Sequence, residues 1–220
     1  MKRDECKNQK KYTDLDKEYE IEVLLGIASD TGDVLGIPEY ASSKTNINKS
    51  VLADALRGEL GSHMRKYPVF SSKTVNGKPL FLYALEGKLN NIKVPEHLEH
   101  IYNIQTAGSY EILSSKLSDK IYGLLDYVPR TDEPSKRLGE DFRVDSIRAS
   151  WKEIFKSLHE RNFTVLRLKV ICASGTYMRS LAGRIGVSLN TKALALSIRR
   201  TRIGKYVHIW NNIGCWFKTV

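Results

Sequence analysis

The residues best suited by type and spacing to bind an anion are the basic side chains near the C-terminus. Residues 161–220 contain eleven Lys or Arg and no Asp or Glu, whereas residues 1–160 carry 24 basic and 25 acidic side chains. The formal net charge of +10 therefore arises from the C-terminal part. A solvated surface normally mixes both signs, so this acid-free stretch predicts a polyanionic partner. A basic face without any partner is the alternative.

Other kinds of site find little support in the sequence. Cys6, Cys172 and Cys215 are widely spaced and form no C-x-x-C pair, so we expect neither a disulfide framework nor a metal site. No run approaches the roughly 18 apolar residues of a membrane span, and Met1–Tyr12 is too polar for a secretory signal. With 220 residues, 41% of them hydrophobic, the chain can form one substantial core. We therefore expect a protein of the reducing cytoplasm.

Alternating apolar and polar residues predict the strands that must position such a site. Residues 19–25 alternate with a period of two, and residues 163–172 do so again. Tyr110–Leu113 is consistent with the start of another strand, and Gly204–Ile209 reads as a last one. Asn76-Gly77, in the middle of residues 70–85, is a strong hairpin signal.

Helical spacing predicts three longer helices. The first is capped by Asn48 or Ser50 and ends before Tyr67; its apolar stripe is Leu52, Leu56, Leu60 and Met64. The others cover Ser150–His159 and Tyr177–Ile185, with a short helical turn expected at 83–87. Ser29–Asp33 reads as a turn, and Asp126–Ser146 as a loop or the start of a helix. Strands and helices do not alternate regularly, so the fold class is α+β rather than a doubly wound sheet.

Four blocks in register resemble the tRNA pseudouridine synthase B (TruB) family. Lys17–Tyr19, Leu25-Gly26 and Asp30–Gly36 resemble its K-x-Y…L-G…T-D-T-x-D-x-x-G block, and Tyr67–Gly87 resembles P-P-x-Y-S-A-x-K-x-x-G-x-x-x-Y-x-x-A-R-x-G. Cys172–Leu181 is close to C-S-K-G-T-Y-I-R-T-L, and Ile198–Tyr206 resembles L-R-R-T-x-x-G-x-F/Y. Each block alone is weak, but together they cover about residues 15–207.

The resemblance implies a pseudouridine-synthase-like fold, with a mixed, mostly antiparallel sheet flanked by helices. It also implies an isomerase that converts one T-loop uridine of tRNA, at tRNA position fifty-five, into pseudouridine without metal or organic cofactor. The base must first leave the RNA stack, because its reacting atoms are inaccessible while it is stacked. The expected partner is the T-arm stem-loop of tRNA, and a monomer is expected.

The resemblance also assigns roles to individual residues. Tyr19 would stack on the flipped uracil and handle a proton; its alternative is the first inward residue of a strand. Arg179 would pair with the catalytic Asp and keep it ionised, with Tyr177 nearby as a supporting residue; its alternative is a surface Arg on a helix. Ile198 would pack on the base. The expected RNA-backbone contacts are Lys17, Lys73, Arg199, Arg200, Arg202 and Lys205.

The sequence departs from the family pattern in several places. The nucleophile belongs to a G-x-L-D-P-x-A-x-G-x-L motif that would fall before Met1; Asp16 is rejected as a substitute because Lys17–Tyr19 follows it. We therefore expect a truncated member that lacks N-terminal strands and leaves an unpaired, partly apolar sheet edge. The expected division is a basic lead-in at 1–14, a partial catalytic domain at 15–209 with an insertion at about 112–160, and a short tail at 210–220 without a PUA domain.

Two functions remain open at this point. The chain either belongs to an enzyme whose printed sequence begins too late, or it is a non-catalytic RNA-binding module derived from the same family. As printed, we expect weak, salt-dependent T-arm binding and no synthase activity.

Overall fold

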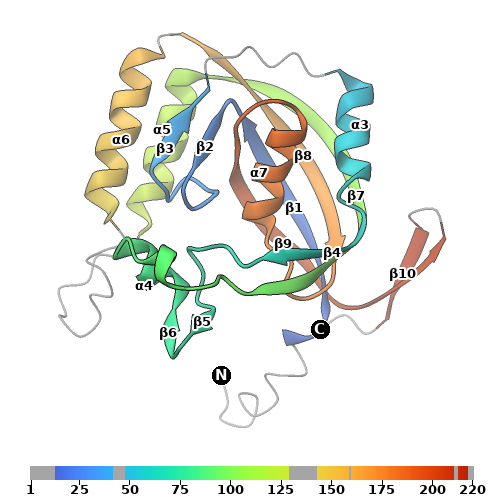
Figure 1. The fold of residues 1–220 in the computed structure, drawn as a ribbon. Coiled ribbons are helices and arrows are strands. Elements are labelled where there is room, and N and C mark those ends of the chain that lie inside the picture. Colours follow the sequence, from blue (N-terminus) through green and yellow to red (C-terminus); the bar gives the residue numbers. More distant parts are fainter. Residues whose placement is uncertain (1–12, 42–47, 129–142, 159, 211–212, 218–220) are drawn as a thin grey trace.

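The computed structural model describes residues 13–41, 48–128, 143–158, 160–210 and 213–217. In this part of the chain, a six-stranded antiparallel sheet with strand order β10-β9-β1-β8-β7-β4 forms the centre of an α+β fold (Figure 1). Its strands are β1 (Asp16–Leu25), β4 (Gly61–Lys66), β7 (Glu96–Leu113), β8 (Asn162–Cys172), β9 (Ala193–Trp210) and β10 (Ile213–Phe217). The α+β prediction is confirmed.

The two strands predicted from alternation lie side by side at the centre of this sheet. β1 pairs with β8 on one edge and with β9 on the other. Tyr19, Ile21, Val23 and Leu25 all point to the same face, as their period of two predicts.

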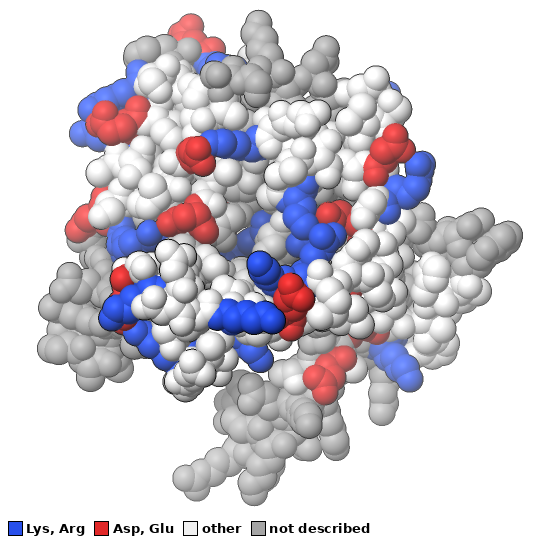
Figure 2. Space-filling view, in the orientation of Figure 1, with Lys and Arg blue, Asp and Glu red and all other residues white. Residues whose placement is uncertain are grey.

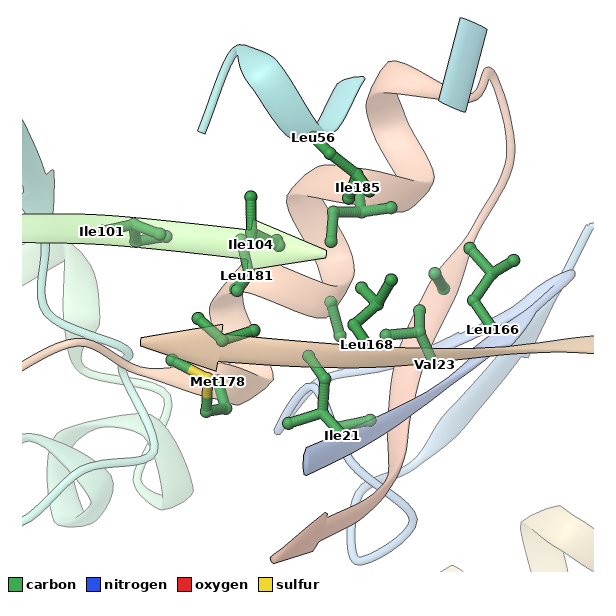
Figure 3. Packing of buried hydrophobic residues seen from close by; sticks show 14 of the residues in the cluster. Ile21, Val23, Leu56, Ile101, Ile104, Leu166, Leu168, Met178, Leu181 and Ile185 are labelled. Carbon is green, nitrogen blue, oxygen red and sulfur yellow. The ribbon is translucent and has the colours of Figure 1, made fainter. Parts of the chain in front are cut away.

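Helix α7 (Met178–Ser188) covers that face, which we call the front face (Figure 1). Leu181 and Ile185 are completely buried against Val23 of β1 and Leu168 of β8, as Figure 3 shows. Helix α3 (Lys49–Arg57) adds Leu56 to the same cluster. The front-face core fixes α7, and with it the residues at the start of that helix, against the middle of the sheet.

The opposite face, which we call the back face, is covered at one end by α5 (Ser114–Asp126) and α6 (Val144–Ser157). Trp151 is fully buried there, and its Nε1–H donates to the carbonyl of Val34 at 3.1 Å. These two helices lie in the region expected to be an insertion; residues 129–142 between them are outside the described part. Along the rest of the back face, the Glu residues of β1 meet cations of neighbouring elements.

Shorter elements lie between the strands of this sheet along the chain. They are β2 (Ile27–Ser29), β3 (Pro38–Tyr40), β5 (Thr74–Val75), β6 (Lys78–Pro79), α4 (Leu80–Leu85) and the 3-10 helix η1 (Leu89–Asn91). β5 and β6 form the hairpin expected from Asn76-Gly77, and both turn residues have positive φ, 51° and 77°. The helical turn expected at 83–87 is α4, which begins three residues earlier.

Several boundaries differ from the sequence predictions. The first helix ends at Arg57 rather than before Tyr67, because Gly58 and Gly61 (φ +87°) interrupt it. Met64 therefore lies in β4 and is 60% exposed. Asn48 does cap α3, with its side chain accepting from the Ser50 N–H at 2.9 Å.

The other differences concern length and one missed helix. Tyr110–Leu113 is the end of an 18-residue strand rather than its start, and Gly204–Ile209 is part of an equally long β9. α5 was not predicted, although Leu117, Ile121 and Leu125 have helical spacing and are buried along one side of it. No helix in the described part of the chain has both the length and the apolarity needed to cross a lipid bilayer.

Candidate functional site

Tyr19 and Arg200 form the centre of the candidate site on the front face. They face each other across β1 and β9, and the Nε–H of Arg200 donates to the Tyr19 hydroxyl at 3.2 Å. The guanidinium carbon also lies 5.4 Å from the centroid of the Tyr19 ring. Burial raises the pKa of Tyr19, against the opposing effect of Arg200, so the phenol stays protonated at neutral pH.

Ile198 lies two residue pairs further along the same two strands. It pairs with the buried Ile21 and is itself 41% exposed. Tyr19, Arg200 and Ile198 therefore present an aromatic, a cationic and an apolar group side by side at the uncovered end of the front face.

Tyr177 and Arg179 come from the start of α7, on either side of the buried Met178. Met178 belongs to the front-face core cluster against which Tyr19 also packs. The two α7 residues face different neighbours, as their spacing predicts. The Tyr177 ring packs against Tyr67 and His97, with ring centroids 6.0 and 5.6 Å away.

Arg179 binds loops on the far side of α7. Its guanidinium donates to the carbonyls of Phe70 (3.0 Å) and Thr31 (3.2 Å) and lies 3.3 Å from Oδ2 of Asp33. The side chain remains 25% exposed. It lines an open cleft of about 630 Å³ that runs along the outer face of α7. Figure 2 shows Lys and Arg gathering around the middle of this side of the molecule, with acidic groups between them.

Asp33 is the acid that sequence reasoning missed. Its Oδ1 accepts from the Thr31 hydroxyl (2.7 Å) and from the Leu35 N–H (3.0 Å), which leaves Oδ2 free to face Arg179. A Cβ on Gly36 would lie only 2.4 Å from Thr31 Oγ1, so this loop requires glycine there. The T-x-D-x-x-G spacing was visible in the sequence, but its pairing with a residue 146 positions away was not.

The expected RNA-contacting cations divide between the two faces of the sheet. Arg199 points to the back face and binds Glu20 of β1, with Nη2 2.7 Å from Oε2. Lys17 is buried, and its ammonium donates to the carbonyls of Thr13 (2.6 Å) and Leu15 (2.5 Å). Burial, reinforced by nearby Arg200, lowers the pKa of Lys17. The side chains of Lys17 and Arg199 thus already bind groups within the protein itself.

The remaining expected cations are more accessible. Lys205 is exposed, and its strand position places it opposite Phe217 of β10. Arg202 is exposed and lies over the Trp216 ring at 5.7 Å. Lys73 Nζ lies 4.9 Å from the Tyr67 ring centroid, beside the Tyr177 cluster.

Asp16 takes the place expected of a structural residue. It begins β1, where its carboxylate accepts from the Tyr102 hydroxyl (3.1 Å) and the Tyr206 N–H (2.8 Å). Within the described residues, no group of His, Cys, Asp and Glu is arranged to hold a metal ion. Cys172 and Cys215 are both free thiols; Cys6 is outside the described part.

The chain thus forms an α+β domain built on an antiparallel sheet, and the front face of this sheet presents an aromatic ring beside a guanidinium group. The family model described as "TruB family pseudouridylate synthase (N terminal domain)" matches residues 3–115, just over half of the chain. The chain therefore belongs to the TruB family.

Curated relatives match over most of this chain at low identity. The tRNA pseudouridine synthase B of Blochmanniella floridana is 24% identical over 192 residues, which are 87% of this chain and 54% of that protein. The protein of the same name from Borreliella burgdorferi (strain ZS7) is 26% identical over 199 residues, 89% of this chain and 50% of its own. The chain spans about half the length of these relatives.

The chain also has matches among solved structures, of which we report one. This match is a chain from "Crystal Structure of a Cbf5-Nop10-Gar1 Complex", with 14% sequence identity and a TM-score of 0.44. The match covers 89% of this chain and 32% of the other chain.

Proposed function

We propose that this chain is part of a tRNA pseudouridine synthase that isomerises the T-loop uridine at tRNA position fifty-five. The observation that carries the proposal is the contact between Tyr19 and Arg200 at the open end of the front face, in a chain of the TruB family. A ring face stacks on an extruded base, and the adjacent guanidinium binds the phosphate of the same nucleotide. The names of the curated relatives agree with this activity.

The reaction breaks the bond between the ribose and a ring nitrogen of uracil and forms a bond from the same ribose carbon to a ring carbon. The proton lost from that carbon is balanced by one gained at the nitrogen, so the product is an isomer of the substrate and no oxidant or reductant is needed. The protein must extract the base, hold it and supply a carboxylate nucleophile. In this proposal Tyr19 stacks on the base, and Ile198 packs against its edge.

Arg179 is proposed to receive that carboxylate. Its present acid partner, Asp33, is at a long 3.3 Å and is already bound on its other oxygen, and the guanidinium lines an open cleft. A second carboxylate can therefore approach without displacing Asp33. The printed sequence contains no G-x-L-D-P-x-A motif, so we propose that the nucleophilic Asp is not among the printed residues.

The cations of the front face are proposed to hold the T-arm backbone. Arg200, Lys205 and Lys73 are all exposed. Arg200 lies over the Tyr19 ring, and Lys73 lies over the Tyr67 ring. They would position the RNA without reading its sequence. A cytoplasmic, monomeric protein remains our expectation.

The missing motif also favours a second function, a non-catalytic RNA-binding module with the same base site. A chimera separates the two: the printed chain extended at its N-terminus by a segment that carries the family motif G-x-L-D-P-x-A-x-G-x-L. The enzyme proposal predicts pseudouridine in a T-arm hairpin with the chimera and none with the printed chain. The activity should disappear when Arg179→Ala is introduced, because the carboxylate then loses its guanidinium partner.

Each other outcome has a clear meaning. A folded chimera that binds the hairpin without forming pseudouridine would favour the RNA-binding module. Pseudouridine formed by the printed chain alone would show that the nucleophile is among its own residues, and Asp16→Asn and Asp33→Asn would then locate it. An Arg179→Ala chimera with full turnover would refute the role given to Arg179.

A further inference from the structure

A network of charged residues, centred on buried Glu99, contacts the start of α7. None of its members takes part in the proposed reaction. Glu99 of β7 is only 3% exposed, and its two carboxylate oxygens face different parts of α7. Oε1 accepts the Tyr177 N–H at 3.2 Å, and Oε2 accepts from Nη2 of Arg184 at 3.1 Å. The Glu99 carboxylate thus links Tyr177, the residue before the helix, to Arg184 in the second turn of the helix.

α7 needs this external support because its own sequence supplies no cap. Its N-cap residue, Tyr177, makes no side-chain capping hydrogen bond, and the first turn contains no acidic residue. The free N–H groups at a helix N-terminus require acceptors, and a negative charge there is favoured by the helix dipole. Glu99 provides both from a neighbouring strand.

His97, two residues before Glu99, holds the turn that leads into the helix. Its Nε2 lies 3.1 Å from the carbonyl oxygen of Gly175 and 3.3 Å from Oε1 of Glu99. Because a carbonyl only accepts, Nε2 carries the proton. Gly175 has φ +90°, a conformation that most residues avoid, so the turn is held in an uncommon shape by the groups around it.

The same imidazole also positions the Tyr177 ring. It stacks on Tyr67 with ring centroids 4.0 Å apart and meets the Tyr177 ring edge-on at 84°. His97 and Glu99 therefore fix the backbone and the side chain of Tyr177 together. Burial raises the pKa of the Tyr177 hydroxyl, so the ring that they fix is a neutral phenol at physiological pH.

The buried charge of Glu99 is balanced through Arg184. The Nε–H of Arg184 donates at 2.9 Å to Glu59, which is also buried and which Arg65 approaches at 3.4 Å. An unpaired carboxylate at this depth would be costly, so the pairing with Arg184 holds the Glu99 side chain in place. Two acids and two guanidinium groups make the network neutral apart from His97.

We infer that Glu99 and His97 are positioning residues of the base site: they hold Tyr177 in place and, through the first turn of α7, keep Arg179 oriented to receive the nucleophilic carboxylate. The inference rests on the proposed function. Neither residue touches the base; both act through the Gly175–Tyr177 turn.

The first test needs no ligand and measures hydrogen exchange at the Tyr177 amide. Glu99→Ala should speed exchange at this amide about tenfold relative to amides in the middle of β8, because its acceptor is lost. Glu99→Gln keeps an acceptor oxygen and should retain most of the protection. Glu96→Ala, an exposed position on the same strand, is the control. Unchanged exchange in a folded Glu99→Ala protein would overturn the inference, whatever the function of the chain.

The second test uses a T-arm hairpin with 2-aminopurine next to the target uridine, whose fluorescence rises when its neighbour leaves the stack. Glu99→Ala and His97→Ala should keep the hairpin Kd within about threefold, since the phosphate contacts persist, while the fluorescence change at saturation falls about fivefold. His97→Gln retains a donor for the Gly175 carbonyl and should restore most of the signal.

The outcomes separate the inference from the proposed function. If the wild-type chain does not bind the hairpin, the proposed function of this face is wrong, while the exchange experiment still decides whether Glu99 and His97 hold the turn. If binding and fluorescence are unchanged in folded variants that have lost protection at Tyr177, the turn is held as described but does not serve base binding, and the inference is wrong. If Glu99→Ala does not fold, the His97→Ala and His97→Gln pair decides the question.

Discussion

The adjacent arginines of β9 provide a sharp test of which face of the sheet binds RNA. Arg200 lies on the front face against Tyr19, whereas Arg199 lies on the back face and binds Glu20. Both are exposed, and both belong to the acid-free C-terminal part. The two arginines contribute equally to the net charge, but the structure places them on opposite faces of the sheet. We therefore compare Arg200→Gln with Arg199→Gln.

The expected magnitudes follow from the surroundings of each arginine. Loss of one exposed phosphate contact at Arg200 should weaken T-arm binding by about 1 kcal/mol, roughly fivefold in Kd. It should also make the slope of log K against log salt less steep by about 0.7 to 0.9. Arg199 and Glu20 are 71% and 50% exposed, so breaking that pair should change the free energy of unfolding by less than about 0.5 kcal/mol and leave RNA binding unchanged.

Fluorescence anisotropy of a labelled T-arm hairpin, measured from about 50 to 200 mM salt, tests both expectations. Urea unfolding of each variant provides the control for stability. Equal losses of affinity in the two variants would show that binding depends on overall charge rather than on the front face. A loss confined to Arg199→Gln would place the RNA on the back face and refute the site described here.

Three further predictions concern the scaffold. Burial and Asp16 raise the pKa of Tyr102 to about 12, above its ordinary value of 10.0. The contribution of Tyr102 to stability is therefore complete below pH 10 and is lost as the pH rises towards 12. In urea unfolding, the free energy of unfolding of the wild-type protein should fall over this range, and that of Tyr102→Phe should fall less steeply. Gly123→Ala in α5, where a Cβ meets nothing within 4 Å, should raise the free energy of unfolding by about 0.5 to 1 kcal/mol; a decrease would mean that α5 packs differently. Gly36→Ala should lower that free energy by about 1 to 3 kcal/mol, because its Cβ would lie 2.8 Å from the Thr31 nitrogen, and a thermal melt matching wild type would contradict the loop geometry around Asp33.

The sequence predicted the central strands well because their environment is reflected in local alternation. In residues 163–172 alternate side chains point to the front face and to the back face, and β8 occupies nearly the same range. The end of α3 could not be predicted in the same way. Leu60 and Met64 continue the spacing of a helix, but Gly58 and Gly61 end it and pairing with β7 makes residues 61–66 a strand. Non-local pairing overrode a local pattern there.

The candidate site was predictable residue by residue but not in its pairings. Tyr19, Tyr177, Arg179 and Ile198 were identified from motifs. The structure places Tyr19 and Ile198 on the neighbouring strands β1 and β9, and Tyr177 and Arg179 at the start of α7. Asp33 and Glu99 were missed, since each meets α7 only through the tertiary fold. The opposite orientations of Arg199 and Arg200 follow from strand alternation, but the sequence predicted a strand only from residue 204.

The location of the positive charge is the point on which sequence and structure differ most. The C-terminal part has no acids of its own, but the fold brings acids to it from elsewhere: Glu18 lies 3.2 Å from Lys169, Glu20 binds Arg199, and Glu59 and Glu99 bind Arg184. These C-terminal cations are therefore already paired with carboxylates of the protein, although the net charge stays at +10. In the described part of the chain, Arg200 and Lys205 are among the cations that keep no carboxylate partner, and both lie on the front face with Tyr19. RNA binding should consequently depend on a few positions around one aromatic ring rather than on the net charge.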